Sequence, residues 1–271
     1  MSEFDEFEKL LASTSENADD MDFSGEFDLT ALSEGIKMDF DLVLCIDVTS
    51  SMLPIINMVK DMALSLYDDI VSTFAIKKRK VINFRVKVIP FRDYYYDGKY
   101  AMTESRFFSL PDENFAFSEY VMGLKAKGGG DEPESALEAI ALAMKSDWVK
   151  AVSEDKKVKN MIVVFTDASA HPFEKAKFGV TKFYPHNMLT SLQDLHDVWV
   201  GRDLLGQASV SDLCRMDPDA RRFIIYAPLD SYPWNEISMF PYVKSCHIES
   251  AFGGEKLDKE TILSDLAGAI R

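Results

Sequence analysis

The stretch LVLCIDVTSSM, residues 42–52, bears on both the fold and the candidate site. Its first residues form an apolar run typical of a buried strand, and Asp47, Thr49 and Ser51 follow at alternating positions before a helical pattern begins. Carboxylate and hydroxyl oxygens are hard donors that suit a small divalent cation such as Mg²⁺. Ser, Thr and Asp are also the preferred helix caps, so the turn taken by itself favours helix capping.

Two further segments favour a metal site. The run KNMIVVFTDASAHP, residues 159–172, places Asp167 at the end of a second apolar strand. The run KGGGDEPESALEAIALAM, residues 127–144, places Asp131 at a glycine-rich helix entry. Ligands of parallel α/β sheets bind beyond the carboxyl ends of the strands. We therefore expect Asp47 and Asp167 to converge if their strands are neighbours in the sheet.

Asp47, Thr49 and Ser51 match the Asp-x-Ser/Thr-x-Ser signature of von Willebrand factor type A domains, which the chain resembles over about residues 38–270. In that family the signature forms a metal-ion-dependent adhesion site, completed by a Thr or Asp from a second loop and an Asp from a third. The resemblance assigns Asp167 to the third loop and Asp131 to the second. In the second loop, the segment GGGDEPES is similar to that of a branch of the family with protist members and intracellular bacterial members.

The resemblance implies a bound Mg²⁺, with Mn²⁺ or Ca²⁺ as alternatives, held by Asp47, Thr49, Ser51, Asp131 and Asp167. A carboxylate at position 131, where many members have Thr, adds negative charge around the ion. That charge should strengthen metal binding and weaken the pull of the ion on an acidic partner group. Asp131 also stands where an N-cap precedes a proline, so the sequence leaves open whether it is a ligand, a cap or both.

Four residues are predicted to contact the partner or to support the ligands: Ser50, Asp93, Gly130 and His171. Asp93 belongs to FRDYYYDG, residues 91–98, which resembles a loop bordering the metal site in related bacterial members. The alternative is a surface turn made by Asp97 and Gly98. His171 is either a hydrogen-bonding neighbour of the ligands or an incidental loop histidine, and the second is the commoner situation.

Strand and helix patterns alternate along the body of the chain. Strands are expected at about 42–46, 84–89, 161–165, 223–227 and 243–248, and the resemblance makes 107–110 an antiparallel edge strand. Helices are expected at 55–74, 113–124, 134–144, 187–198, 209–215 and 259–270. These βαβ units predict an α/β protein. The resemblance specifies a Rossmann-like fold with a central, mainly parallel six-stranded sheet, one short antiparallel edge strand and helices on both faces.

The composition fits one domain with an acidic extension. The 271 residues are 47% apolar and 12% aromatic, enough to bury a large core. Of the formal net charge of −15, residues 1–30 contribute −9 through ten Asp or Glu and one Lys, which leaves −6 elsewhere. We therefore predict an acidic, poorly ordered tail at 1–37 and a von Willebrand factor type A-like domain at 38–271. Apolar residues at helical spacing within 4–11 leave open an amphipathic docking helix.

Cysteine usage and the absence of targeting signals bound the compartment. Cys45, Cys214 and Cys246 are odd in number and widely spaced, so we expect reduced thiols in the core. The chain shows neither the basic, apolar leader of a secretory signal nor the long apolar run of a spanning helix. We expect a soluble, cytoplasmic protein, and the acidic balance argues against nucleic acid and anionic membrane as partners.

Two functional classes remain to be compared. The first is a non-catalytic, adhesion-type module for protein–protein interaction, in which the ion accepts an oxygen from a partner. The second is a phosphoryl-transfer enzyme of haloacid-dehalogenase type, since Asp47 follows a buried strand. Such enzymes use an Asp two residues after the nucleophile as general acid, and here that residue is Thr49. Because no common catalytic motif occurs either, the sequence predicts a binding module and not an enzyme.

Overall fold

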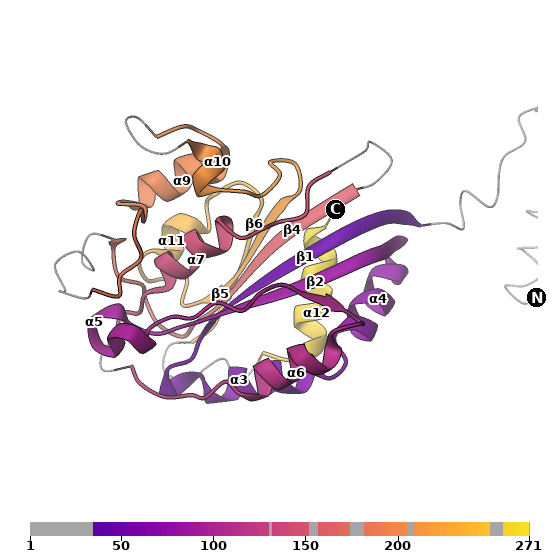
Figure 1. The fold of residues 1–271 in the computed structure, drawn as a ribbon, viewed down its shortest axis with the longest axis horizontal. Helices are drawn as coiled ribbons and strands as arrows, with labels where there is room; N and C mark the ends of the chain where they lie inside the picture. Colours follow the sequence, from indigo (N-terminus) through magenta and orange to yellow (C-terminus); the bar gives the residue numbers. More distant parts are fainter. Residues whose placement is uncertain are drawn as a thin grey trace, which may run out of the picture. The chain divides into compact units, whose positions relative to one another are not determined.

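The central sheet has six strands in the order β3-β2-β1-β4-β5-β6 (Figure 1). The computed structural model describes residues 35–129, 132–151, 157–173, 182–204, 209–249 and 257–270. The parallel strands are β1 (Ile36–Asp47), β2 (Arg79–Phe91), β4 (Lys157–Phe165), β5 (Arg221–Ala227) and β6 (Val243–His247), and β3 (Phe108–Leu110) pairs antiparallel with β2. The predicted α/β class, with one antiparallel edge strand, is confirmed.

Helices cover both faces of this sheet (Figure 1). One face packs against α3 (Leu53–Ala63), α4 (Leu66–Ile76), α6 (Asn114–Met122) and α12 (Lys259–Ala269). The other packs against α7 (Ala136–Met144), α9 (Leu192–Val200), α10 (Val210–Leu213) and α11 (Trp234–Ile237). Alternate residues of β1 enter the two cores, Leu42 and Leu44 on the first face and Val43 and Cys45 on the second. A strand buried on both faces explains the continuous apolar run.

The first strand is longer than predicted, because it starts at Ile36 instead of Leu42. Asp41 lies inside the added part and is buried. Its Oδ1 accepts a hydrogen bond of 2.8 Å from Nε of Arg85 on β2, so a cross-strand ion pair satisfies the carboxylate. A charged residue in an apolar run predicts the end of a strand. Here the strand continues past Asp41, because the ion pair with Arg85 on the neighbouring strand compensates the buried charge.

Two helix boundaries also differ from the prediction. The helical stripe at 55–74 is interrupted between Ala63 and Leu66, so that α3 and α4 are separate helices. Helix α9 begins at Leu192 instead of residue 187, because the Ser191 hydroxyl accepts a hydrogen bond of 3.0 Å from the backbone N–H of Asp194. That contact is an N-cap and fixes the first turn.

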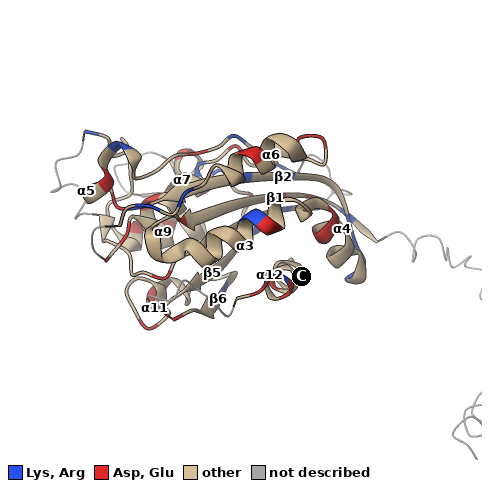
Figure 2. Cartoon of the chain, turned by 90° about the horizontal axis from the view of Figure 1, so that it is seen from below, with Lys and Arg blue, Asp and Glu red and all other residues tan. Residues whose placement is uncertain are grey.

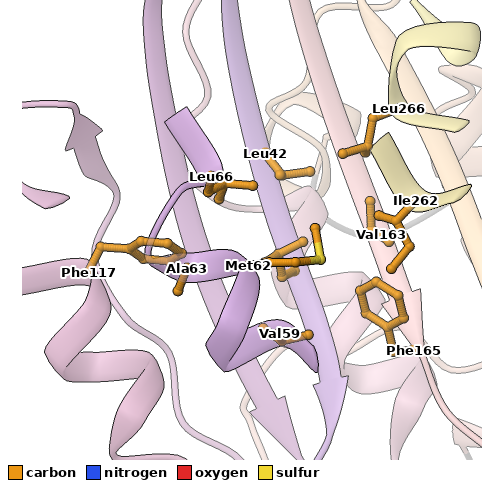
Figure 3. Close-up of a pocket in the computed structure, with 11 residues that line it drawn as sticks. Leu42, Val59, Met62, Ala63, Leu66, Phe117, Val163, Phe165, Ile262 and Leu266 are labelled. Carbon is orange, nitrogen blue, oxygen red and sulfur yellow. The ribbon is translucent and has the colours of Figure 1, made fainter. Parts of the chain in front are cut away.

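A small cavity lies between the sheet and the helices α3 and α12. Its volume is about 20 Å³, and the side chains that line it are all apolar. Figure 3 shows Val59 and Met62 of α3 facing Val163 and Phe165 of β4, with Leu266 of α12 nearby. The volume would admit a water molecule, but no lining group offers a hydrogen bond, so we expect the cavity to stay dry.

The thiols of Cys45 and Cys214 are buried, that of Cys246 is partly exposed, and none of the three is in a disulfide. Over the described parts of the chain, no helix has the length and apolarity to cross a membrane.

Candidate metal centre

Asp47 and Asp167 lie at the carboxyl ends of neighbouring parallel strands. Strand β1 ends at Asp47 and pairs with β4, which ends at Phe165. The chain continues from β1 to β2 on one side and reaches β4 on the other, so the strand order reverses between β1 and β4. Open α/β sheets typically bind their ligands at such a switch point.

The Asp47 carboxylate is fully buried and accepts hydrogen bonds at both oxygens. Its Oδ1 lies 2.9 Å from the backbone nitrogen and 2.7 Å from Oγ1 of Thr49, and its Oδ2 lies 2.8 Å from Oγ1 of Thr166. Burial raises the pKa of Asp47 to about 6; the hydrogen bonds from Thr49 and Thr166 act to lower it, and the charge of Asp167 acts to raise it. The carboxylate is therefore held in one orientation.

The hydroxyls of Thr49 and Ser51 connect the two carboxylates. Ser51 Oγ donates to Oδ1 of Asp167 at 3.0 Å and lies 3.4 Å from Thr49 Oγ1. The side chain of Thr49 makes no capping hydrogen bond to the short helix η1 (Ser50–Met52) that follows it. The structure thus brings together Asp47, Thr49, Ser51 and Asp167, and the hydroxyls face carboxylates instead of capping a helix.

The second loop reaches this cluster through residues 125–129. The backbone nitrogen of Lys127 donates to Val48 O at 3.0 Å, and Ser50 Oγ donates to Gly128 O at 3.2 Å. Gly129 has φ +75°, and a Cβ there would lie 2.9 Å from Cβ of Thr49. Glycine is therefore needed where the loop packs on the signature turn. Gly130 and Asp131 lie outside the described residues, so their assigned roles stay predictions.

Arg92 holds the second loop in place, a role that the sequence did not reveal. Its Nη1 donates to Tyr100 O at 2.8 Å, its Nη2 donates to Lys125 O at 3.1 Å, and its Nε donates to Lys127 O. One guanidinium thus binds the carbonyl of Tyr100 and two carbonyls of the second loop. An Arg beside a predicted site residue, followed later by a glycine-rich loop, is the signal that could have indicated it.

Asp93 and His171 form a second polar cluster beside the first. Both are buried, and His171 Nε2 lies 3.5 Å from Asp93 Oδ1. Asp93 Oδ1 also accepts from the backbone nitrogen of Tyr95 at 3.0 Å and lies 3.4 Å from Oγ of Ser135. Asp93 is thus the N-cap of α5 (Tyr94–Asp97), which leads into η2 (Gly98–Tyr100). The segment that the alternative interpretation made a surface turn at Asp97 and Gly98 is therefore two short helices.

The donor set of the first cluster suits a hard cation. No three His, Cys, Asp or Glu side chains of the described residues come together as a metal-binding group. The cluster instead offers two carboxylates, of Asp47 and Asp167, and two hydroxyls, of Thr49 and Ser51. Oxygen donors of this kind fit Mg²⁺, Mn²⁺ or Ca²⁺ better than Zn²⁺. A cation would also offset the mutual repulsion of the carboxylates.

A family model for the von Willebrand factor A domain matches residues 41–182, which is more than half of the chain. The chain belongs to the von Willebrand factor A domain family. The match includes the signature turn, the second loop and Asp167. No curated protein sequence matches the chain.

Three solved structures match the chain at low sequence identity. Proximal thread matrix protein 1 from the mussel byssus is 12% identical, with a TM-score of 0.41, and the match covers 88% of this chain and 48% of that protein. The pilus adhesin SpaC from Lactobacillus rhamnosus GG is 12% identical, with a TM-score of 0.44, and the match covers 86% of this chain and 30% of the adhesin. Its open conformation gives 13% identity, a TM-score of 0.44 and the same coverage. The chain therefore spans about half of the mussel protein and less than a third of the adhesin.

Proposed function

We propose that this von Willebrand factor A domain is a non-catalytic protein-interaction module that holds a divalent cation, Mg²⁺ foremost, where β1 and β4 end. Membership of the family supports the interaction role. The cluster of Asp47, Thr49, Ser51 and Asp167, linked by contacts of 2.7, 3.0 and 3.4 Å, carries the metal proposal. Asp131 completes the ligand set from the second loop. Mn²⁺ and Ca²⁺ suit the same oxygens.

The residues of the proposed metal centre have different roles. Asp47 and Asp167 supply negative charge, and Thr49 and Ser51 supply neutral oxygens. When bound, the cation offers a positive centre to one oxygen of the partner protein. The exposed Ser50, beside Gly128, takes part in the contact with that partner. The similarity of GGGDEPES to the bacterial intracellular branch supports a cytoplasmic setting. The formal net charge of −15 disfavours nucleic acid and anionic membrane as partners.

Calorimetric titration of the full chain with Mg²⁺ and Mn²⁺ tests the metal. We expect wild type to bind one ion and Asp47→Asn to lose binding, because the amide lacks the charge but keeps the shape. Asp112→Asn changes an exposed carboxylate and is the matched control. Circular dichroism verifies that each variant is folded. Equal metal affinity of wild type and a folded Asp47→Asn rejects the proposal.

A pull-down from native lysate, with and without chelator, tests the interaction. We expect a protein partner that chelator releases and that Asp47→Asn fails to capture. A generic aryl phosphate ester provides the contrasting assay. Turnover of that ester by wild type, lost in Asp47→Asn, would overturn the non-catalytic role in favour of the haloacid-dehalogenase alternative.

A further inference from the structure

The amino-terminal edge of the sheet is basic, in contrast to the edge that bears Asp47 and Asp167. Every parallel strand has a cation among its first three residues, namely Lys37 on β1, Arg79 and Lys80 on β2, Lys157 and Lys159 on β4, Arg221 and Arg222 on β5, and Lys244 on β6. Figure 2 shows blue segments at this end of the sheet, beside α4. The chain as a whole has a formal net charge of −15, so this edge departs strongly from the average.

Four of these cations lie on the face of the sheet that α12 covers: Arg79, Lys157, Lys159 and Arg222, here called the basic strip. Side chains alternate between the two faces of a strand. Met161 of β4 and Ile224 of β5 belong to the core under α12, and Val81 of β2 packs against it. The strip residues share the parity of these three residues and therefore project to the same side.

The cations of the basic strip repel one another. The pKa of Lys159 is lowered to about 8, first by partial burial and then by the charges of Arg222, Arg79 and Lys157, whereas Asp219 acts to raise it. Arg79, Lys157 and Lys159 form no ion pair with any residue that the structure describes. Like charges held together cost stability, and an anionic partner would relieve the repulsion.

Arg222 is oriented by its neighbours. Its Nε donates to Ala269 O at the end of α12 at 2.9 Å, and its guanidinium lies 5.1 Å from the centre of the Tyr242 ring. These contacts fix one end of the strip. An oriented guanidinium binds a carboxylate with less loss of side-chain entropy than a mobile lysine.

We propose that the basic strip is a docking surface for an acidic polypeptide segment of a partner protein. The strip crosses β2, β1, β4 and β5, and with about 4.8 Å between strands it spans about 14 Å. An extended peptide advances about 3.3 Å per residue, so about four to five residues span this length, and carboxylates on alternate residues point to the same side of the peptide. The net negative charge of the chain disfavours a nucleic acid in this place. Because the strip lies at the opposite edge from Asp47, docking needs no metal.

Fluorescence anisotropy of a fluorescein-labelled oligoglutamate peptide, titrated with the full chain at low ionic strength, tests the proposal. We expect saturable binding that weakens with salt, persists in chelator and weakens at least about tenfold in Lys159→Gln/Arg222→Gln. Lys60→Gln/Lys99→Gln makes the same change in net charge elsewhere and should bind like wild type. Lys157→Gln alters an exposed member of the strip and should weaken binding without affecting the fold.

Each other outcome overturns the proposal. No binding by wild type, or equal losses in the strip variant and its control, removes the site-specific role. The chain's own acidic segment is a second possible occupant of the strip. It is tested with a full chain in which the acidic residues within 1–30 are replaced by their amides. Binding of oligoglutamate only in that variant would assign the strip to the chain's own acidic segment. Preference for vesicles of anionic lipid over the peptide would assign it to a membrane surface. Because binding of oligoglutamate is measured in the presence of chelator, its outcome does not depend on whether the proposed metal centre exists.

Discussion

Oγ1 of Thr166 lies 2.8 Å from Oδ2 of Asp47 and joins two residues that are 119 positions apart in the chain. Both side chains are buried. The Thr166 hydroxyl also accepts a hydrogen bond of 3.2 Å from the backbone nitrogen of Ala168, so its proton is directed at the carboxylate. Thr166 therefore orients the first acid of the signature turn from the neighbouring strand, as supporting residues do for metal ligands.

Thr166→Val removes that hydrogen bond with almost no change in shape. We expect the free energy of unfolding to fall by about 1–3 kcal/mol, because a buried oxygen of Asp47 loses its donor. Metal affinity should fall by about 10–100-fold, since the orientation of Asp47 is no longer fixed. Urea unfolding without metal and calorimetry with Mn²⁺ measure the two effects. Thr166→Ser keeps the hydroxyl, and a loss of affinity equal to that of the valine variant would contradict the positioning role.

The sequence predicted the strands and the two acidic residues at their ends, but not the side chains that connect them. Apolar runs ending in Asp47 and Asp167 are local signals, and parallel pairing brings strand ends together by geometry. Thr166 carries no such signal, because the sequence does not indicate which neighbouring strand the side chain of a threonine at a strand end contacts. Arg92 was missed for a similar reason, since its second-loop partners are the backbone carbonyls of Lys125 and Lys127, 33 and 35 positions away. The unpredicted start of β1 likewise depends on one long-range partner, Arg85.

Gly129→Ala tests the close approach of the second loop to Thr49. The new Cβ would meet Cβ of Thr49 at 2.9 Å and the backbone would keep φ +75°, so the loop must move away from the signature turn. We expect metal affinity to fall at least about tenfold. Gly201→Ala is the matched control, because Gly201 has φ +85° and open space around it. It should lose about 1 kcal/mol of stability and no metal affinity. Equal metal binding by both variants would show that the loop approach is unimportant.

Val59→Ile tests the cavity beneath α3 and α12. One added methyl group can enter the space of about 20 Å³ and gain contacts with apolar neighbours. We expect the free energy of unfolding to rise by up to about 1 kcal/mol, measured by urea unfolding. Leu266→Ala enlarges the same cavity and should cost about 2–5 kcal/mol. A loss of stability in Val59→Ile would mean that the side chains cannot accommodate the extra volume.

Glu138 is a carboxylic acid in the core that the helical pattern did not single out. It is fully buried on α7, its Oε1 accepts a hydrogen bond of 2.8 Å from the Tyr184 hydroxyl, and its Oε2 has no hydrogen-bond partner among the described residues. Burial raises the pKa of Glu138 from an ordinary value of 4.5 to about 7; the Tyr184 hydrogen bond acts to lower it, and the charge of Asp93 acts to raise it. The carboxyl group is therefore protonated at mildly acidic pH.

Glu138→Gln should remove this proton-linked loss of stability. Between pH 4.5 and about 7 the folded protein holds a proton on Glu138 that the unfolded chain has released, so the free energy of unfolding falls as the pH rises. Relative to wild type, the variant should therefore gain about 3 kcal/mol between pH 4.5 and pH 8. Urea unfolding across that range measures the difference. Glu119→Gln, on the exposed side of α6, should follow the wild-type profile. Parallel profiles of wild type and Glu138→Gln would show that Glu138 does not retain a proton in the folded protein.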